Sequence, residues 1–294
     1  MCFSRQDSDS ALFKQVLMLI FDSIHFTRYI FIYEKNRLTL YEGGELMKKW
    51  HILPFVFCVI VFALLNCGKA QKPEHRAGIS FRAAKTSESP VIDGILNETC
   101  WGNAPTGDFH NNTGGGEPGK STKIRIVYDD SNLYIGFECQ DPDAASTITG
   151  RDSPVSEEEY VAAYIDADCD SNTYVLIEIA PTGAMSDAFV VTGRNGSETK
   201  VLRDWDSERL RVSVSVYGGG ARPGTEDRFW TVEMAIPFRD FFTAPHTPPL
   251  SGQRWRADFF RVELTGSREL YAFAPTESGS FHKPDRFAWL IFGE

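Results

Sequence analysis

Short runs that alternate between polar and apolar side chains are the feature that most constrains the fold of this chain. Leu210–Val216, Trp230–Ile236 and Trp255–Glu263 each follow a period of two, with turn-forming residues between them. Such a period places alternate side chains on opposite faces of a strand. Helical periodicity is nearly absent, apart from short turns near 97–101 and 238–242. The pattern predicts an all-β fold, an antiparallel β-sandwich of jelly-roll type.

Two further strand pairs extend this pattern. Lys123–Tyr128 and Leu133–Cys139 flank a turn and predict a hairpin, while 160–165 and 174–179 flank an Asp-rich connection. No internal repeat or long linker interrupts the region. We therefore expect residues 72–294 to form one domain, since sandwiches of this length often do.

The amino-terminal region has a different composition. Residues 47–70 resemble a secretory signal peptide, with two lysines before an apolar run from 52 to 65 that is too short to span a membrane. This predicts that translation begins at Met47 and that residues 1–46 are not translated or not part of the fold. A genuine extension of 46 residues is the alternative.

Two cleavage sites compete at the end of this signal. Leu64–Cys67 is similar to a bacterial lipobox with Cys67 as the lipidated residue, although Asn66 stands where a small residue is usual. Gly68–Ala70 fits an ordinary signal-peptidase site. Either site predicts an exported protein, as a periplasmic or outer-membrane lipoprotein or as a secreted one. A lipid anchor is the one membrane attachment that we expect.

Charge and cysteine content narrow the partners. With 40 acidic and 30 basic residues, the formal net charge is −10, and no basic cluster interrupts the acidic surface, so a nucleic-acid partner is not expected. Cys100, Cys139 and Cys169 follow the signal and lack metal-ligand spacing. One disulfide with one buried thiol, or three buried thiols, are both open.

The closing segment carries the first candidate site. A loop rich in Pro, Gly and Ser holds Phe273, Phe281 and His282, and then leads into the apolar strand that contains Phe287 and Trp289. We expect the last two to close the core. The three loop side chains are less expected in a core. Aromatic side chains on such a loop suit flat, partly apolar ligands such as sugar rings.

Two charged residues fall on an apolar strand face. Arg261 and Glu263 follow Phe259 onto the same side of their strand. Burying charges is costly unless they are paired or bound to a polar group. One interpretation is an internal ion pair with Glu178 or Glu233; the other is a polar cleft floor that bonds sugar hydroxyls.

An Asp-rich turn is a candidate metal site. Asp166, Asp168, Asp170 and Asn172 place oxygen side chains at every second position, which suits calcium. It is not an EF-hand loop, because the glycine is absent. A solvated acidic turn is the alternative, since Asp and Asn favour turns. We expect no organic cofactor.

Six segments, in order along the chain, are similar to those of one family. They are 91–101, 127–137, 164–168, 230–238, 252–261 and 281–287, and they span about residues 78–292. Together they resemble family 9 carbohydrate-binding modules. The resemblance implies a β-sandwich that binds poly- or oligosaccharides, commonly carries structural calcium, and occurs beside glycoside hydrolases or as a stand-alone envelope protein.

The resemblance also assigns positions in the site. Known sugar-binding members clamp the sugar between two aromatic side chains, and Phe281 falls where one belongs. The other position falls near Ser156, which is not aromatic, and a glutamate expected on the next strand falls at Ala162. Phe273 stands where many relatives have Trp.

These positions complete the predicted site. It comprises Phe281 and Phe273 as stacking residues, with Arg261, Glu263, His282 and Ser278 as hydrogen-bonding residues. No catalytic motif was found: the acidic residues show no visible pair in an apolar setting.

We therefore expect an exported, non-catalytic carbohydrate-binding protein that holds saccharides near hydrolases or uptake proteins. One alternative is an envelope scaffold that kept the fold but lost sugar binding. A second is a haem-binding sandwich that uses Met185, Met234 or His282 as a ligand.

Overall fold

The computed structural model describes residues 78–294 apart from 115, 194–198, 222–223, 225 and 265, together with the backbone of three short strands near the amino terminus. Those strands, β1 (Tyr29–Glu34), β2 (Arg37–Glu42) and β3 (Glu45–Leu46), form an antiparallel sheet of their own. Residues 75–294 form a separate compact unit from 1–74. The predicted signal at 47–70, including Cys67, lies outside the described residues.

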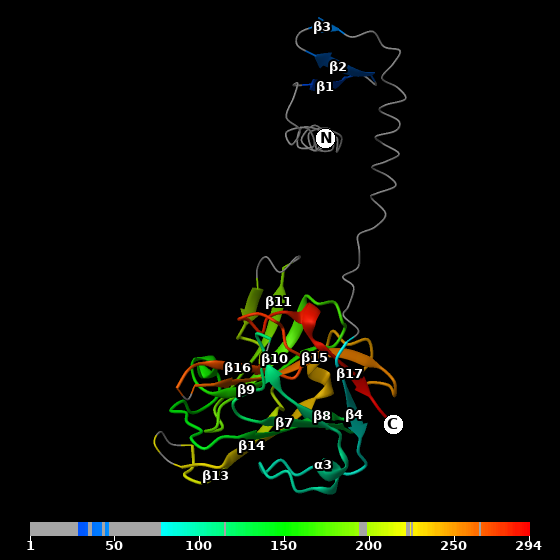
Figure 1. Cartoon of the computed structure of the whole chain (residues 1–294). Coiled ribbons are helices and arrows are strands. Elements are labelled where there is room, and N and C mark those ends of the chain that lie inside the picture. The colour runs from blue at the N-terminus through cyan, green and yellow to red at the C-terminus, as the bar shows by residue number, and fades with distance from the viewer. Residues whose placement is uncertain are drawn as a thin grey trace. The chain divides into compact units, whose positions relative to one another are not determined.

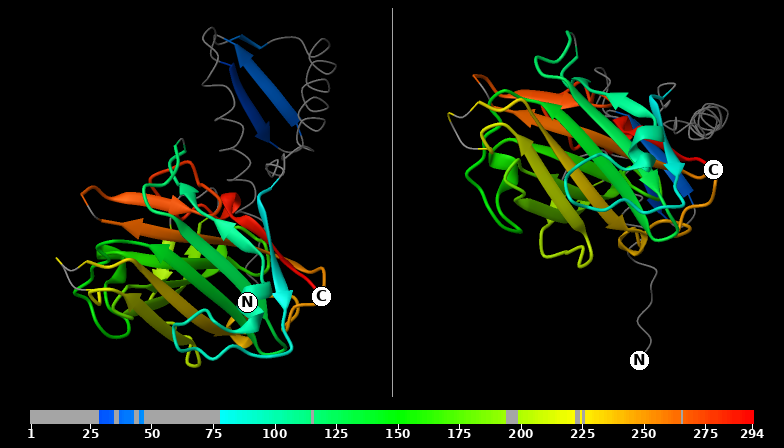
Figure 2. Two further views of the ribbon diagram at one scale, coloured as in Figure 1. Left: turned by 60° about the horizontal axis from the view of Figure 1, so that its bottom comes forward. Right: turned by 90° about the horizontal axis from the view of Figure 1, so that it is seen from below.

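The 75–294 unit is built from one continuous 14-stranded sheet, whose two halves pack face to face (Figures 1 and 2). The first half, in spatial order, comprises β12 (Thr199–Leu202), β11 (Met185–Thr192), β10 (Thr173–Ile179), β9 (Tyr160–Asp166), β15 (Arg254–Glu263) and β17 (Ala288–Phe292). At its side, β16 (Glu269–Ala272) pairs with β15 and with β6 (His110–Asn111). The second half comprises β7 (Thr122–Tyr128), β8 (Asn132–Gln140), β14 (Phe229–Pro237) and β13 (Arg211–Tyr217), with β5 (Thr106–Asp108) beside β7.

The predicted all-β sandwich is confirmed, with one difference in strand direction. β4 (Ser80–Lys85) joins the two halves by pairing in parallel with β17 on one side and with β7 on the other. The other strand pairings described in this unit are antiparallel, as expected. Among the residues that the structure describes, helical structure is confined to α3 (Thr99–Asn103), η1 (Val155–Glu157), η3 (Phe238–Asp240) and η4 (Pro284–Arg286).

Three apolar clusters hold these layers. The main core lies between the halves and includes Trp230, Trp255 and Phe259. A second cluster covers the outer face of the first half, around Tyr164 and Phe260. Central strands such as β9 are therefore buried on both faces, which explains why their sequences are nearly all apolar. The third cluster lies on the outer face of the second half, where Trp101 of α3 packs.

Glu233 fixes the segment that opens the unit. This fully buried carboxylate on β14 accepts hydrogen bonds from the indole Nε1 of Trp101 at 2.7 Å and from the backbone nitrogens of Asp93 and Gly94 at 3.0 and 2.8 Å. Gly94 has φ +89°, and a Cβ there would lie 2.9 Å from the backbone carbon of Val214. Glu233 thus has a structural role and is no partner of Arg261, which corrects one sequence-based expectation.

The three cysteines of this unit form no disulfide bond with one another. Cys100, Cys139 and Cys169 are all free thiols, and Cys139 is buried. Burial raises the pKa of the Cys139 thiol to about 12, so it packs as a neutral side chain. Within the part of the chain that the structure describes, no helix has the length and apolar character to span a membrane.

Candidate functional site

A pocket of about 210 Å³ opens on the outer face of the first half of the sheet. β9 and β10 supply its buried floor, and the loop after β16 supplies one wall. Exposed side chains from two other loops form the rim. The floor residues are Tyr160, Tyr164, Leu176 and Glu178, the wall includes Phe281 and His282, and the rim carries Arg203 and Arg268. Ser156 of η1 also lines the pocket.

Glu178 places a carboxylate at the floor of this pocket. Its side chain is buried, and Oε1 accepts a hydrogen bond of 3.3 Å from the Tyr164 hydroxyl. Oε2 accepts no hydrogen bond from the described residues, and Nη1 of Arg203 lies 4.0 Å away. Burial raises the pKa of Glu178. A buried carboxylate oxygen without a donor is costly to a fold, so this atom is suited to bind a ligand donor.

Glu178 also lies opposite Ala162, the position where the family resemblance would place a glutamate. The glutamate that the family resemblance places on β9 falls at Ala162, and in the antiparallel register Ala162 lies directly opposite Glu178 on β10. Residues paired in this way point to the same face of the sheet. Glu178 therefore places a carboxylate on the same face of the sheet as Ala162, from the neighbouring strand. From the sequence alone, Glu178 was considered only as an ion-pair partner of Arg261.

His282 lies in the wall and is held by a floor strand. Its Nδ1 is 2.5 Å from the hydroxyl of Tyr174, and its ring lies 5.4 Å from that of Tyr164, centroid to centroid. Burial and the charge of Arg203 lower the pKa of His282, so the imidazole is neutral at physiological pH. Where Tyr174 donates to Nδ1, Nε2 carries the proton and can donate to a ligand.

The two loop phenylalanines are more buried than the sequence suggested. Phe281 is 6% exposed and stacks on Phe260, with ring centroids 4.2 Å apart and planes at 19°. Phe273 is 8% exposed and packs edge-on against Phe81 in the main core. The expectation that these rings lie outside the core is wrong, because the loop folds back onto the sheet. Phe281 still lines the pocket, whereas Phe273 does not.

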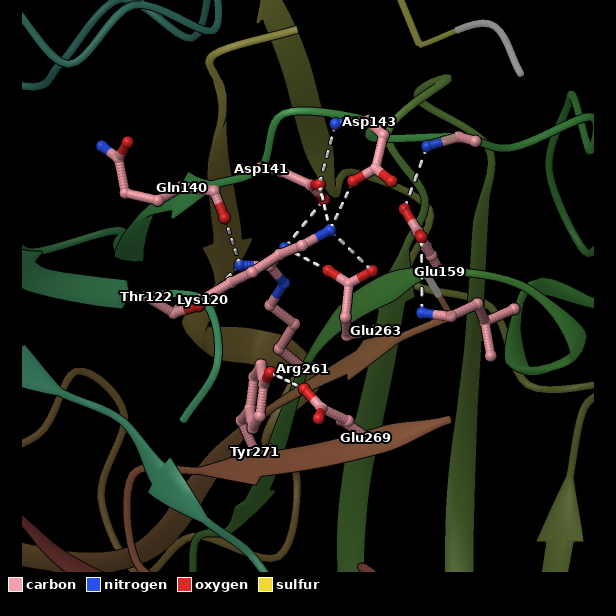
Figure 3. A network of polar contacts seen from close by, with 12 residues as sticks. Lys120, Thr122, Gln140, Asp141, Asp143, Glu159, Arg261, Glu263, Glu269 and Tyr271 are labelled. Atoms are coloured by element: carbon pink, nitrogen blue, oxygen red, sulfur yellow. Dashed lines mark hydrogen bonds and ion pairs between the residues drawn. The ribbon is translucent and has the colours of Figure 1, made fainter. Parts of the chain in front are cut away.

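Arg261 and Glu263 form part of a buried ion network (Figure 3), and neither side chain lines the pocket. Arg261 Nη2 lies 2.7 Å from both Asp141 Oδ2 and Glu263 Oε2, while Nη1 donates to Thr122 Oγ1 and to the carbonyl of Gln140. The interpretation as an internal ion pair is therefore correct, although the partners are not Glu178 or Glu233. The prediction that these two residues form the floor of a sugar-binding cleft is wrong, because both side chains are 1% exposed.

Lys120 completes this network as a second cation. Its Nζ lies 2.6 Å from Asp141 Oδ1, 2.6 Å from Asp143 Oδ1 and 2.9 Å from Glu263 Oε1. These carboxylates raise the pKa of Lys120 despite its burial. Asp141, Glu159 and Glu263 bring their carboxylate oxygens within 4.8 Å of one another. Lys120 and Arg261 already supply positive charge to this group.

Glu159 holds its proton to a higher pH than an ordinary glutamate does. Its oxygens accept hydrogen bonds from the backbone nitrogens of Ala145 at 2.9 Å and Leu264 at 3.3 Å. Burial, together with the nearby charges of Glu263 and Asp141, raises the pKa of Glu159 to about 8. The folded protein thus holds a proton that the unfolded chain releases near its ordinary value of 4.5.

This shift predicts a pH dependence of stability. Stability from the raised pKa of Glu159 is complete below the unfolded value of 4.5 and is lost as the pH rises through about 8. Glu159→Gln, which mimics the protonated acid, should therefore lose less stability than the parent between about pH 5 and about pH 8. Urea unfolding at both pH values measures this difference. Glu157→Gln, an exposed neighbour, is the control. Equal pH slopes in the parent and Glu159→Gln would contradict the prediction.

Ser278 stabilises the wall loop. Its hydroxyl donates to the carbonyl of Ser280 at 2.8 Å, and its own carbonyl accepts from the amide of Asn112 at 2.9 Å. The Asn112 Oδ1 also accepts from the backbone nitrogen of Thr276 at 2.9 Å. Asn112 is fully buried. It anchors the loop from beside β6, and a single asparagine in a polar stretch offered no signal of this role.

The Asp-rich turn forms a compact carboxylate group. Asp166, Asp168 and Asp170 place ligand oxygens within 4.8 Å of one another, and oxygen donors of this kind fit calcium. Asp166 is fully buried and accepts from the backbone nitrogens of Ser171 at 2.9 Å and Asp170 at 3.3 Å. Burial and the neighbouring carboxylates raise the pKa of Asp166 to about 8. The side-chain amide of Asn172 donates a hydrogen bond to the Asp170 carbonyl and so stabilises the turn.

The residues considered for haem do not converge. Met234 is fully buried in the main core, and Met185 packs against the same core. His282 belongs to the pocket on the outer face of the first half. The side chains therefore do not form a common pair of axial ligands.

Comparisons with known proteins place the fold. No protein-family model matches the chain, and a sequence comparison with curated proteins found no match. A candidate carbohydrate-binding protein from Bacteroides uniformis superposes with a TM-score of 0.60 at 16% identity, over 73% of this chain and 99% of that one. A family 9 carbohydrate-binding module from Caldicellulosiruptor kristjanssonii, solved with cellotriose, gives a TM-score of 0.51 at 15% identity, over 73% and 93%. The chain has the fold of a family 9 carbohydrate-binding module.

This family 9 fold brings together only part of the predicted site. Phe281, His282 and Ser156 line one pocket with Glu178, although they are far apart in sequence. Ser278 supports the same loop through its hydrogen bonds. Phe273, Arg261 and Glu263 lie in the main core and the ion network.

Proposed function

We propose that this chain is a non-catalytic carbohydrate-binding protein that holds saccharides in the pocket above Glu178. The observation that carries the proposal is the buried Oε2 of Glu178, which lies in a pocket with aromatic lining and accepts no hydrogen bond from the described residues. Sugar rings combine an apolar face with hydroxyl donors, so they suit an aromatic wall beside an acceptor. Two proteins with the same fold, one of them solved with cellotriose, support the same class of ligand.

The arrangement of the pocket indicates how a sugar would bind. Ring hydroxyls would donate to Glu178, and Nε2 of His282 would bond another oxygen of the sugar. Phe281 offers limited stacking, because one face of its ring is covered by Phe260. Apolar burial contributes about 25 cal/mol per Å², so a small platform gives weak binding. We expect millimolar to high micromolar affinity.

Titration calorimetry of the full chain against glucose, cellotriose and xylo-oligosaccharides tests this proposal. Saturable binding that Glu178→Gln weakens would support it. The absence of binding to these and to other plant and bacterial polysaccharides would contradict it. That outcome would favour the scaffold function, in which the fold is kept without sugar affinity, and the covered rings of Phe281 and Phe273 are consistent with that alternative.

The cellular role that we propose follows from the predicted leader. An exported protein, anchored through Cys67 or released, would hold saccharides near glycoside hydrolases or uptake proteins outside the cytoplasm. Fractionation of cells and metabolic labelling with a fatty acid would separate the lipidated form from the soluble one. Cys67→Ser would abolish labelling if the lipobox is used.

We also propose that the turn formed by Asp166, Asp168 and Asp170 binds structural calcium. Binding to the folded state alone raises stability by about 2.7 kcal/mol at a calcium concentration one hundred times the Kd. The midpoint of thermal unfolding should therefore rise on adding calcium and fall with a chelator. Asp168→Asn should remove this response, whereas Asp130→Asn, an exposed control elsewhere, should keep it. An unchanged midpoint would contradict the calcium site.

A further inference from the structure

The rim of the pocket carries an excess of positive charge. Arg203 and Arg268 line the pocket, and both residues are exposed. The other ionisable residues of the lining are Glu178 at the floor and His282, Tyr160 and Tyr164, which are neutral at physiological pH. Two permanent cations therefore face a single buried acid, in a protein whose formal net charge is −10.

These two arginines differ from others in the described part of the chain. Arg151, Arg261 and Arg286 each have a carboxylate oxygen within 2.7 to 3.0 Å. Arg203 approaches Glu178 only to 4.0 Å and donates to the hydroxyl of Ser186 at 2.6 Å. Among the described residues, Arg268 has no carboxylate partner, and its one hydrogen bond, to the carbonyl of Ser156, is 3.5 Å long. Both guanidinium groups retain donors for an anion.

The pocket is also polarised from its floor to its rim. Glu178 is 2% exposed, whereas the side chain of Arg203 is 49% exposed. A ligand that enters thus meets guanidinium groups at the mouth and a carboxylate acceptor below. Arginine binds carboxylates and other planar or tetrahedral anions through paired N–H donors.

We propose that the pocket selects acidic saccharides, with hydroxyls directed to Glu178 and the anionic group of the sugar bound by Arg203 and Arg268. This inference rests on the proposed saccharide-binding function and adds the ligand class. A hexuronate carboxylate and a sulfate ester share the required charge. Neutral sugars can occupy the floor but bring no anionic group to the two guanidinium groups.

Matched pairs of sugars test the inference on the full chain. Glucuronate and glucose, or galacturonate and galactose, differ only in the carboxylate, and galactose 6-sulfate tests the sulfate ester. Each uronate should bind at least about tenfold more tightly than its parent hexose. Higher ionic strength should weaken uronate binding and leave hexose binding unchanged. Tighter binding of the sulfate ester than of galacturonate would assign the anion as sulfate.

Arginine variants identify the residues responsible. Arg203→Gln and Arg268→Gln should each lower uronate affinity severalfold and change hexose affinity by less than about twofold. Arg211→Gln, an exposed position on β13, is the matched control and should change neither. Thermal unfolding of each variant verifies the fold.

Three results separate the two proposals. Equal affinity for uronate and hexose, or an equal loss of both in the arginine variants, would overturn the acidic ligand and keep saccharide binding. No binding of any sugar would overturn both proposals. Uronate binding without detectable hexose binding would support both.

Discussion

Replacement of Glu178 by glutamine should weaken saccharide binding at least about tenfold without destabilising the protein. Hydrogen bonds to a charged group contribute about 1.5–3 kcal/mol, and 1.4 kcal/mol corresponds to a factor of ten in affinity. The amide keeps the shape of the carboxylate but loses its charge and one acceptor oxygen. Because Oε2 has no hydrogen-bond donor in the described structure, the fold gains little from its charge.

Two measurements on the same variant separate a binding role from a structural one. Titration calorimetry with the tightest-binding sugar gives the change in affinity, and urea unfolding gives the change in stability. Glu138→Gln is the matched control, because Glu138 lies on β8 in the other half of the sheet. Unchanged affinity in Glu178→Gln would exclude Glu178 as a ligand contact. A large loss of stability would indicate that its carboxylate supports the fold.

Replacement of Arg261 by methionine should lower the free energy of unfolding by about 3–5 kcal/mol. The variant leaves Asp141 and Glu263 buried with Lys120 as their remaining cation, and it leaves the Gln140 carbonyl without this donor. Removing one partner of a buried ion network destabilises a protein more than replacing the whole network by apolar side chains, because the remaining buried charges are left uncompensated.

The same strand provides the control. Arg254 is exposed at the start of β15, and Arg254→Met should change stability by less than about 0.5 kcal/mol. Chemical unfolding of both variants, with the parent measured under the same conditions, gives the comparison. A cost below about 1 kcal/mol for Arg261→Met would contradict the buried network.

The fold could be predicted because strand alternation is a local property. The hairpin of β7 and β8 and the strands β13, β14 and β15 follow from period-two patterns and turn residues. The parallel pairing of β4 between β17 and β7 could not be predicted. Its pairing with β17 joins segments about 200 residues apart and its pairing with β7 joins segments about 40 apart, and no local periodicity specifies which edges meet.

The site was predicted less well because it depends on long-range packing. Phe281 and His282 were found from the composition of their loop, but burial of the rings depends on how that loop closes on Phe260. Glu178 was not identified as a ligand contact because its position opposite Ala162 depends on strand register. Arg261 and Glu263 were correctly placed on an inward face, yet their partner Asp141 lies 120 residues away in sequence.

The position of β17 has a consequence for the stage of synthesis at which the domain can fold. This strand is near the carboxyl end, yet it lies inside the sheet between β15 and β4. On the ribosome, the sandwich therefore cannot close until Ala288–Phe292 have been made. Until then, the edges of β15 and β4 remain open to chaperones.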